Sequence, residues 1–273
     1  MTHPDMTRPA LIATDLDGTL LRSDGTLSDA SRRVLAAVED AGVPVVFVTG
    51  RPVRWMVDLW EVVGAHGLAI VSNGAVLYDV AQRAVRRVDG LAPEPGLAMV
   101  ELLREVVPQP RFAIECLDGL RLEADFHDPH RVPPGSPVGA LSEVWDDVAV
   151  KVLVRHDGVD DRVLDDVARA VGDRAVPTWS MPGLLEISAP GVTKAAALAR
   201  LCADLDVSAV DVVAFGDMPN DLAMLGWAGT SYAVANAHDD VRAAAHHTAE
   251  TNDDDGVARV MARLVGLTDD LVQ

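Results

Sequence analysis

Short apolar runs that end abruptly in polar residues constrain the fold of this chain more than any other feature of its sequence. The first run, Ala10 to Thr14, leads directly into Asp15-Leu16-Asp17-Gly18. Two more follow, at residues 43–48 before Thr49-Gly50 and at residues 68–72 before Asn73-Gly74. Such runs are typical of strands that are buried on both faces of a parallel sheet.

Helical signals separate these runs. Ser28 is a suitable N-cap, and apolar residues follow it at helical spacing as far as Gly42. Pro52 suits the first turn of a second helix, which we expect to end near Gly64. The alternation of strand and helix predicts an α/β fold with a Rossmann-like parallel sheet.

The alternation is lost between about residues 83 and 188, where proline and glycine are frequent. We expect helices here near 94–107 and 159–171, and strands near 111–116, 121–124, 149–155, 175–179 and 184–188. After Pro190-Gly191 the first rhythm returns, with a helix from Thr193, a strand at 211–215, a helix at 220–226, a strand at 232–235 and a last helix at 256–264. The sequence therefore predicts a parallel-sheet core from residues 1–82 and 189–273, with an α+β insertion at 83–188.

Composition narrows the possible partners. The chain has 273 residues, 49% of them hydrophobic, and a formal net charge of −19, which disfavours nonspecific binding to nucleic acid. No stretch approaches the roughly 18 apolar residues of a membrane span. Cys116 and Cys202 lie far apart, as expected for two reduced thiols. We expect a cytoplasmic protein without membrane or nucleic-acid partners, either a monomer or a weak homo-oligomer.

The polar residues at the predicted strand ends are those that phosphoryl transfer requires. In an open α/β sheet, ligands bind at the carboxyl ends of the strands, where Asp15, Thr49 and Asp217 would meet. Asp15 can act as a nucleophile and Asp17 can exchange protons with the leaving oxygen. Mg²⁺ prefers oxygen ligands such as the carboxylates of Asp15 and Asp217. The hydroxyl of Thr49, the loop amides around Gly50 and the ammonium of Lys194 can hold phosphoryl oxygens.

These residues resemble the motifs of the haloacid dehalogenase-like hydrolase superfamily, in the same order and at similar spacing across the whole chain. The matching pieces are Asp15-Leu16-Asp17-Gly18-Thr19-Leu20, Thr49-Gly50-Arg51, Lys194 and Gly216-Asp217-Met218-Pro219-Asn220-Asp221. The insertion resembles the α/β cap of the Cof-like phosphatase branch, and residues 72–75, 235–237 and 252–256 resemble that branch as well. One departure is Ala195, where many relatives carry glycine.

The resemblance implies a magnesium-dependent phosphatase that forms an aspartyl-phosphate on Asp15. It places the metal among Asp15, the main-chain carbonyl of Asp17 and Asp217, with Asn220 and Asp221 in support. The predicted catalytic residues are thus Asp15 and Asp17, the predicted phosphate-binding or substrate-binding residues are Thr49, Gly50, Lys194 and Asn220, and the predicted metal-site residues are Asp15, Asp17, Asp217 and Asp221.

The sequence leaves two other functions open. A phosphotransferase or phosphosugar mutase would use the same intermediate, and a catalytically silent binding protein would use the same fold. The expected substrate is a small phosphorylated metabolite, either a sugar phosphate or a phosphorylated cofactor. Four residues of the insertion are candidates to face the leaving group: Glu115, Arg121, Glu123 and Lys151. The pair His127 and His130 is not expected to bind metal.

Overall fold

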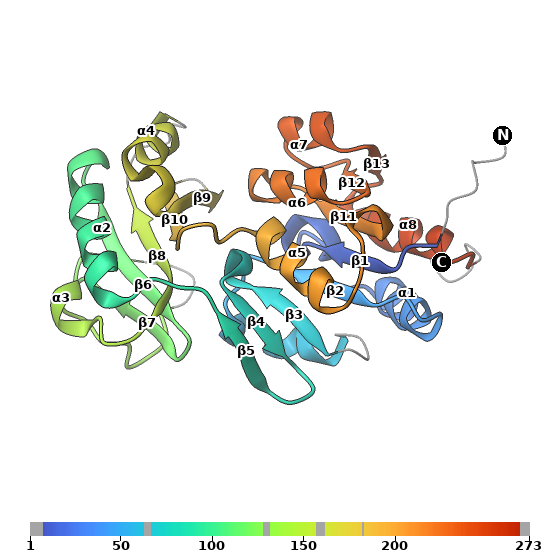
Figure 1. Cartoon of the computed structure of the whole chain (residues 1–273), viewed down its shortest axis with the longest axis horizontal. Helices are drawn as coiled ribbons and strands as arrows, with labels where there is room; N and C mark the ends of the chain where they lie inside the picture. The colour runs from blue at the N-terminus through green and yellow to red at the C-terminus, as the bar shows by residue number, and fades with distance from the viewer. Residues whose placement is uncertain (1–7, 63–66, 128–131, 157–161, 182, 268–273) are drawn as a thin grey trace.

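Two sheets form the framework of the protein (Figure 1). The computed structural model describes residues 8–62, 67–127, 132–156, 162–181 and 183–267. The first sheet has eight strands in the order β13-β12-β11-β1-β2-β3-β4-β5. The second has five, in the order β7-β6-β8-β10-β9.

The first sheet is parallel from β13 through β3, and the β4 and β5 strands join its edge antiparallel. Its central strand, β1, is buried along its whole length, as an apolar strand covered on both faces should be. The strands are β1 (Leu11–Thr14), β2 (Val45–Val48), β3 (Leu68–Val71), β4 (Val76–Asp79), β5 (Ala84–Val88), β11 (Val212–Gly216), β12 (Thr230–Val234) and β13 (His247–Ala249).

Helices cover both faces of this sheet (Figure 1). Helix α1 (Asp29–Asp40) packs against α8 (Gly256–Leu264), and α5 (Lys194–Asp204) packs against α6 (Leu222–Trp227) on the other face. Helix α7 (Asp239–Ala244) lies beside α6. The Ser28 hydroxyl accepts the Ser31 backbone N–H at 2.9 Å, which caps α1 as predicted. In the part of the chain that is described, no helix is long and apolar enough to cross a membrane.

The second sheet is antiparallel throughout and carries its helices on one face. Phe112, Ile114 and Val152 point to this face, where they pack with helices of the same segment. Ala113, Leu153 and Leu184 point to the opposite face. The elements are α2 (Pro93–Val106), β6 (Arg111–Cys116), β7 (Gly119–Leu122), α3 (Leu141–Val144), β8 (Ala149–Arg155), α4 (Arg162–Val171), β9 (Val176–Met181) and β10 (Leu184–Ser188).

The predicted fold class, a parallel-sheet core with an inserted α+β segment, is confirmed. The boundary at residues 82–83 stays a prediction, and it falls in the turn between β4 and β5, both of which belong to the first sheet. Below, the cap means the chain from α2 through β10, and the core means the part that carries the first sheet.

One predicted helix is wrong. Residues 52–62 form two short 3₁₀ turns, Val53–Trp55 and Val57–Val62, instead of an α-helix that starts at Pro52. Met56 is fully buried between the turns, so this segment is shaped by tertiary packing that local propensity does not encode. Among the described residues, five further strands and α-helices were not predicted from the sequence: β4, β5, α3, α7 and β13.

We predict that Gly96→Ala destabilises the protein, although alanine is the better helix former by about 1 kcal/mol. A Cβ atom on Gly96 would overlap the indole ring of Trp145, which is buried against α2. Thermal unfolding should therefore show a lower midpoint for this variant. Gly226→Ala in α6 is the matched control: no neighbouring atom lies within 4 Å of its added Cβ, so its midpoint should stay equal or rise.

Candidate active site at the strand ends

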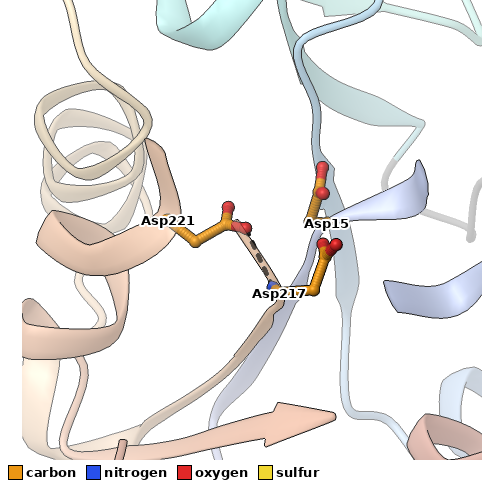
Figure 2. Close-up of side chains that lie close together, drawn as sticks. All are labelled: Asp15, Asp217 and Asp221. Atoms are coloured by element: carbon orange, nitrogen blue, oxygen red, sulfur yellow. Dashed lines mark hydrogen bonds between the residues drawn. The ribbon is translucent and has the colours of Figure 1, made fainter. Parts of the chain in front are cut away.

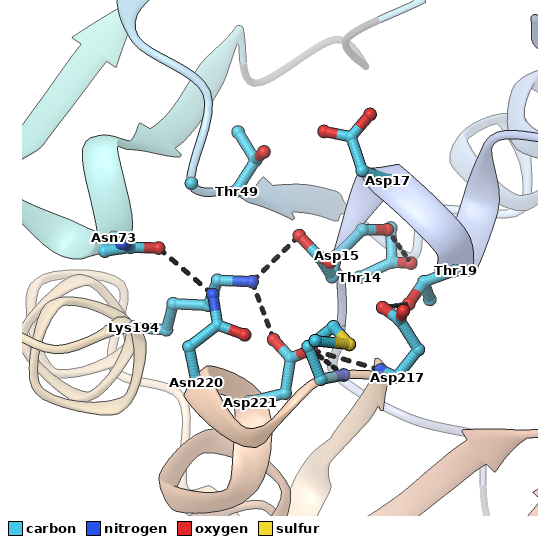
Figure 3. Close-up of polar contacts among 12 residues, drawn as sticks. Thr14, Asp15, Asp17, Thr19, Thr49, Asn73, Lys194, Asp217, Asn220 and Asp221 are labelled. Atoms are coloured by element: carbon cyan, nitrogen blue, oxygen red, sulfur yellow. Dashed lines mark hydrogen bonds and ion pairs between the residues drawn. The ribbon is translucent and has the colours of Figure 1, made fainter. Parts of the chain in front are cut away.

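The carboxyl ends of β1, β2 and β11 meet at the point where the order of the first sheet reverses direction. β1 lies between β11 and β2. The strands β2 and β3 continue the sheet on one side of β1, and β11, β12 and β13 continue it on the other. Asp15 follows β1, Thr49 follows β2 and Asp217 follows β11. Figure 3 shows these side chains around one space, together with Lys194. Ligands of open α/β sheets bind at such switch points.

Three buried carboxylates form the centre of this site (Figure 2). One oxygen atom from each of Asp15, Asp217 and Asp221 lies within 4.8 Å of the others. The three residues are between 0% and 6% exposed. Across the described ranges, this is the one group of three or more side chains with atoms placed to hold a metal ion.

Lys194 is the cation that the structure itself provides for this cluster. It opens α5, where the hydroxyl of Thr193 caps the helix by accepting the Ala196 N–H. Its ammonium lies 2.8 Å from Asp15 Oδ1 and 2.7 Å from Asp221 Oδ1, and the residue is 1% exposed. The two carboxylates compensate for a positive charge placed at the helix N-terminus, where the helix dipole disfavours it.

Burial and neighbouring charges shift the pKa values of Asp15, Asp217 and Lys194. Burial raises the pKa of Asp15 well above its ordinary value, and Lys194 opposes the shift while Asp221 and Asp217 add to it. Burial and the nearby Asp221 raise the pKa of Asp217 to about 6. Burial lowers the pKa of Lys194, but attraction to its two carboxylates outweighs burial and raises it. When all three carboxylates are ionised, the single ammonium leaves excess negative charge that a further cation would neutralise.

Asp221 holds the loop after β11 in place. Its Oδ2 accepts the backbone N–H groups of Asp217 and Met218, each at 3.1 Å, while its Oδ1 binds Lys194. Both oxygens therefore already have protein donors. Asp217 is held from the other side, because the Thr19 hydroxyl donates to its Oδ1 at 2.6 Å.

Gly18 permits the close approach of the loops that carry Asp15 and Asp217. Its φ of +76° belongs to the left-handed region, and a Cβ atom there would collide with the Asp217 carboxylate. The turn at residues 16–20 therefore needs glycine for two reasons, conformation and space. The Asn236 amide also donates to the Gly18 carbonyl at 2.7 Å.

Asp17 lies outside the carboxylate cluster. Its side chain is exposed, and it accepts two hydrogen bonds from Arg51, at 2.8 and 2.6 Å. Figure 3 shows Asp17 and Thr49 beside the space above Asp15. Arg51, the last residue of the Thr49-Gly50-Arg51 motif, is thus paired with Asp17. The metal role implied for Asp17 concerns its main-chain carbonyl and stays a prediction.

The remaining predicted residues lie around the same space. Thr49 is fully buried, and its hydroxyl accepts the Arg51 N–H at 3.0 Å. The side-chain amide of Asn220 donates to Asn73 Oδ1 at 3.2 Å. Thr19 and Asn73 were not among the predicted site residues, although both lie in segments that resemble the family motifs.

The strand register separates the four candidate residues of the insertion. Glu115 pairs with Lys151 across β6 and β8, on the face that meets the core, and Arg54 of the core binds Glu115 at 2.7 and 2.8 Å. Arg121 pairs with Ile114, on the helix-covered face. Glu123 binds Arg104 of helix α2. His130 lies outside the described residues.

The cluster fits a hard divalent cation by its donor chemistry. All of its ligand atoms are carboxylate oxygens, the type that Mg²⁺ prefers, and no sulfur or imidazole ligand belongs to it. The buried charge excess gives such a cation an electrostatic reason to bind. This confirms that the chain has a buried aspartate cluster able to hold a metal ion.

Comparison with known proteins places this site in a family context. Residues 12–261 match the family described as haloacid dehalogenase-like hydrolase. The chain is 30% identical to the 5-amino-6-(5-phospho-D-ribitylamino)uracil phosphatase YitU of Bacillus subtilis (strain 168), over 96% of this chain and 99% of that protein. It is 29% identical to the pyridoxal phosphate phosphatase YbhA of Escherichia coli (strain K12), over 91% of this chain and 96% of that protein. The crystal structure of SMU.1108c from Streptococcus mutans UA159 has the same fold, with a TM-score of 0.82 at 24% identity over 94% of this chain and 99% of that one.

We predict that Lys194→Met lowers the free energy of unfolding by about 3 kcal/mol or more, because it leaves buried carboxylates without their cation. Urea denaturation in the presence of a chelator measures this loss. Arg200→Met is the control, since the Arg200–Asp89 pair is partly exposed and should contribute less than about 1 kcal/mol. Equal stabilities of the two variants would contradict the assigned role of Lys194.

Proposed function

Because the chain belongs to the haloacid dehalogenase-like hydrolase family, we propose that it is a magnesium-dependent phosphatase that transfers a phosphoryl group to Asp15 and then to water. The predicted enzyme class, a phosphoric monoester hydrolase, is confirmed by the family match and by the phosphatases among its relatives. The metal, the intermediate and the residue roles are the proposal. The observation that carries it is the buried Asp15 carboxylate, held by Lys194 beside Asp217 and Asp221.

Asp15 is the nucleophile of this proposal. One of its carboxylate oxygens attacks the phosphorus atom, and the bond between phosphorus and the ester oxygen breaks. The hydrogen bond from Lys194 to Oδ1 fixes the orientation of the carboxylate before the attack. Water then attacks the phosphorus atom of the aspartyl-phosphate, which releases inorganic phosphate and restores Asp15.

Asp17 exchanges the protons in both steps. Its carboxyl group protonates the leaving oxygen in the first step and accepts a proton from water in the second. In the structure, Arg51 holds the Asp17 carboxylate on the exposed side of the loop.

The proposed metal site consists of the carboxylates of Asp15 and Asp217, with the Asp17 carbonyl. Mg²⁺ bound there would supply positive charge opposite the phosphoryl oxygens and keep Asp15 ionised. Asp221 contributes by holding Lys194 and the backbone of the Asp217 loop, since its own oxygens are occupied. The Thr49 hydroxyl, the Gly50 loop, Lys194 and Asn220 bind the phosphate group.

The proposed substrate is a small phosphorylated metabolite, either a sugar phosphate or a phosphorylated cofactor. The relatives named above act on a phosphorylated ribityl compound and on pyridoxal phosphate, and both belong to this size class. Arg54 of the core binds Glu115 of the cap, and this contact supports the proposal that the cap limits the space for the leaving group. To identify the substrate, the protein is incubated with Mg²⁺ and each metabolite of such a panel, and the release of inorganic phosphate is measured.

We predict that Asp15→Asn lowers the hydrolysis of p-nitrophenyl phosphate by about a thousandfold or more, since the amide cannot form the intermediate. Mass spectrometry of the wild-type chain after a short reaction should find the phosphoryl group on Asp15. Asp206→Asn, at an exposed position after α5, is the control and should keep wild-type activity. If Asp15→Asn retained full activity, the proposed mechanism would be wrong.

We also predict that a chelator abolishes phosphate release and that Mg²⁺ restores it. Asp217→Asn should raise the Mg²⁺ concentration needed for half-maximal activity by at least about tenfold, because a charged ligand is lost while the acceptor for Thr19 remains. Mg²⁺ should also raise the unfolding temperature of the wild-type chain, and raise it less for the variant. An unchanged Mg²⁺ requirement would exclude Asp217 as a ligand.

A further inference from the structure

A buried ion pair of the cap reaches into the core beside the candidate active site. Lys151 of β8 and Glu186 of β10 lie on the core-facing side of the second sheet, 2.8 Å apart between Nζ and Oε2. They are 3% and 8% exposed. Burying two charges is expensive, and an apolar pair of similar size is often as stable or more so. The stability of the cap alone therefore does not explain this pair.

Each member of the pair also contacts a loop of the core. The Lys151 ammonium donates to the main-chain carbonyl of Gly50 at 2.8 Å. Glu186 Oε2 accepts the side-chain amide of Asn73 at 2.6 Å. The pair thus connects two neighbouring strands of the cap to the loops that follow β2 and β3 of the core.

Asn73 extends this connection to the third loop of the site. Its Oδ1 accepts the side-chain amide of Asn220, the residue before Asp221, at 3.2 Å. Its backbone N–H donates to the Thr49 carbonyl at 3.0 Å, and its φ of +57° is left-handed. The fit is tight, because a Cβ atom on Gly50 would lie only 3.0 Å from Asn73 Oδ1.

We propose that Lys151 and Glu186 are positioning residues of the reaction, through which the closed cap orders the loops carrying Thr49, Gly50 and Asn220. The proposal rests on the proposed function, because that function assigns these loops to phosphate. When the cap is closed, the Gly50 carbonyl and the Asn73 amide have charged partners that fix them. When it opens, these two groups lose their partners and the loops relax. Catalytic groups misplaced by about 1 Å can lose about a hundredfold in rate.

The activity test compares Lys151→Met, Glu186→Gln and the double variant, with p-nitrophenyl phosphate and Mg²⁺. Each single variant leaves one buried charge without its partner in the closed state, so kcat should fall about tenfold or more, with a smaller change in KM. The decreases in kcat of the two single variants should not add in the double variant, because both residues act through one hydrogen-bond network. Lys151→Arg keeps a charged donor and should recover part of kcat.

Arg121→Met is the matched control. Arg121 is also a buried cation of the cap, but it lies on the helix-covered face and its ion pairs, with Asp118 and Asp146, stay inside the cap. This variant loosens the cap without touching the core loops. It should therefore lower the unfolding temperature while kcat stays near the wild-type value.

Amide hydrogen exchange tests the same proposal without activity. Exchange at residues 49–51 and 72–75 should be faster in Lys151→Met than in the wild type, and unchanged in Arg121→Met. A wild-type chain that hydrolyses no phosphate ester would overturn the proposed function, while exchange would still decide the role of Lys151 in ordering the loops. Equal exchange and equal kcat in Lys151→Met and Arg121→Met would overturn the inference.

Discussion

The pair of contacts from the Lys194 ammonium to Asp15 and Asp221 is the interaction on which the site depends. Without a cation between them, these two buried carboxylates would repel each other. Lys194 bridges the two carboxylates, with its nitrogen 2.8 Å from Asp15 and 2.7 Å from Asp221. Lys194 belongs to α5, which follows the cap in the sequence. The core therefore gains this cation only where the chain returns from the cap.

The sheet supplies the other half of this arrangement. β1 is central and its side chains are fully buried, so its end can deliver Asp15 into the interior rather than to solvent. β11 beside it delivers Asp217, and Gly18 lets the two loops touch. The hydrogen-bonded register of neighbouring parallel strands already fixes the distances between their ends. The loops that follow the strands therefore need to place each side chain only locally.

Much of this could be predicted from the sequence, because the strand ends were marked by abrupt changes from apolar to charged residues. The strands containing Leu11, Val45 and Val212 were found in this way, and so was the meeting of Asp15 and Asp217. Asp221 entered only through the resemblance to the family. The segment after Pro52 was not, because its turns follow the burial of Met56 rather than helical periodicity. The sequence also could not predict which face of each cap strand meets the core. That depends on the strand register, which places Lys151 on the core-facing side and Arg121 on the other.

The polar character of the contact between cap and core has a consequence for turnover. An apolar contact resists opening, because separation exposes its whole area to water. The Lys151, Glu186 and Arg54 contacts resist it less, since water can replace their hydrogen bonds when the two parts separate. Such a contact is specific when closed, because each charge needs its partner in the dry interior. Under the proposed function, the ordering of the loops and the release of product would then depend on the same few hydrogen bonds.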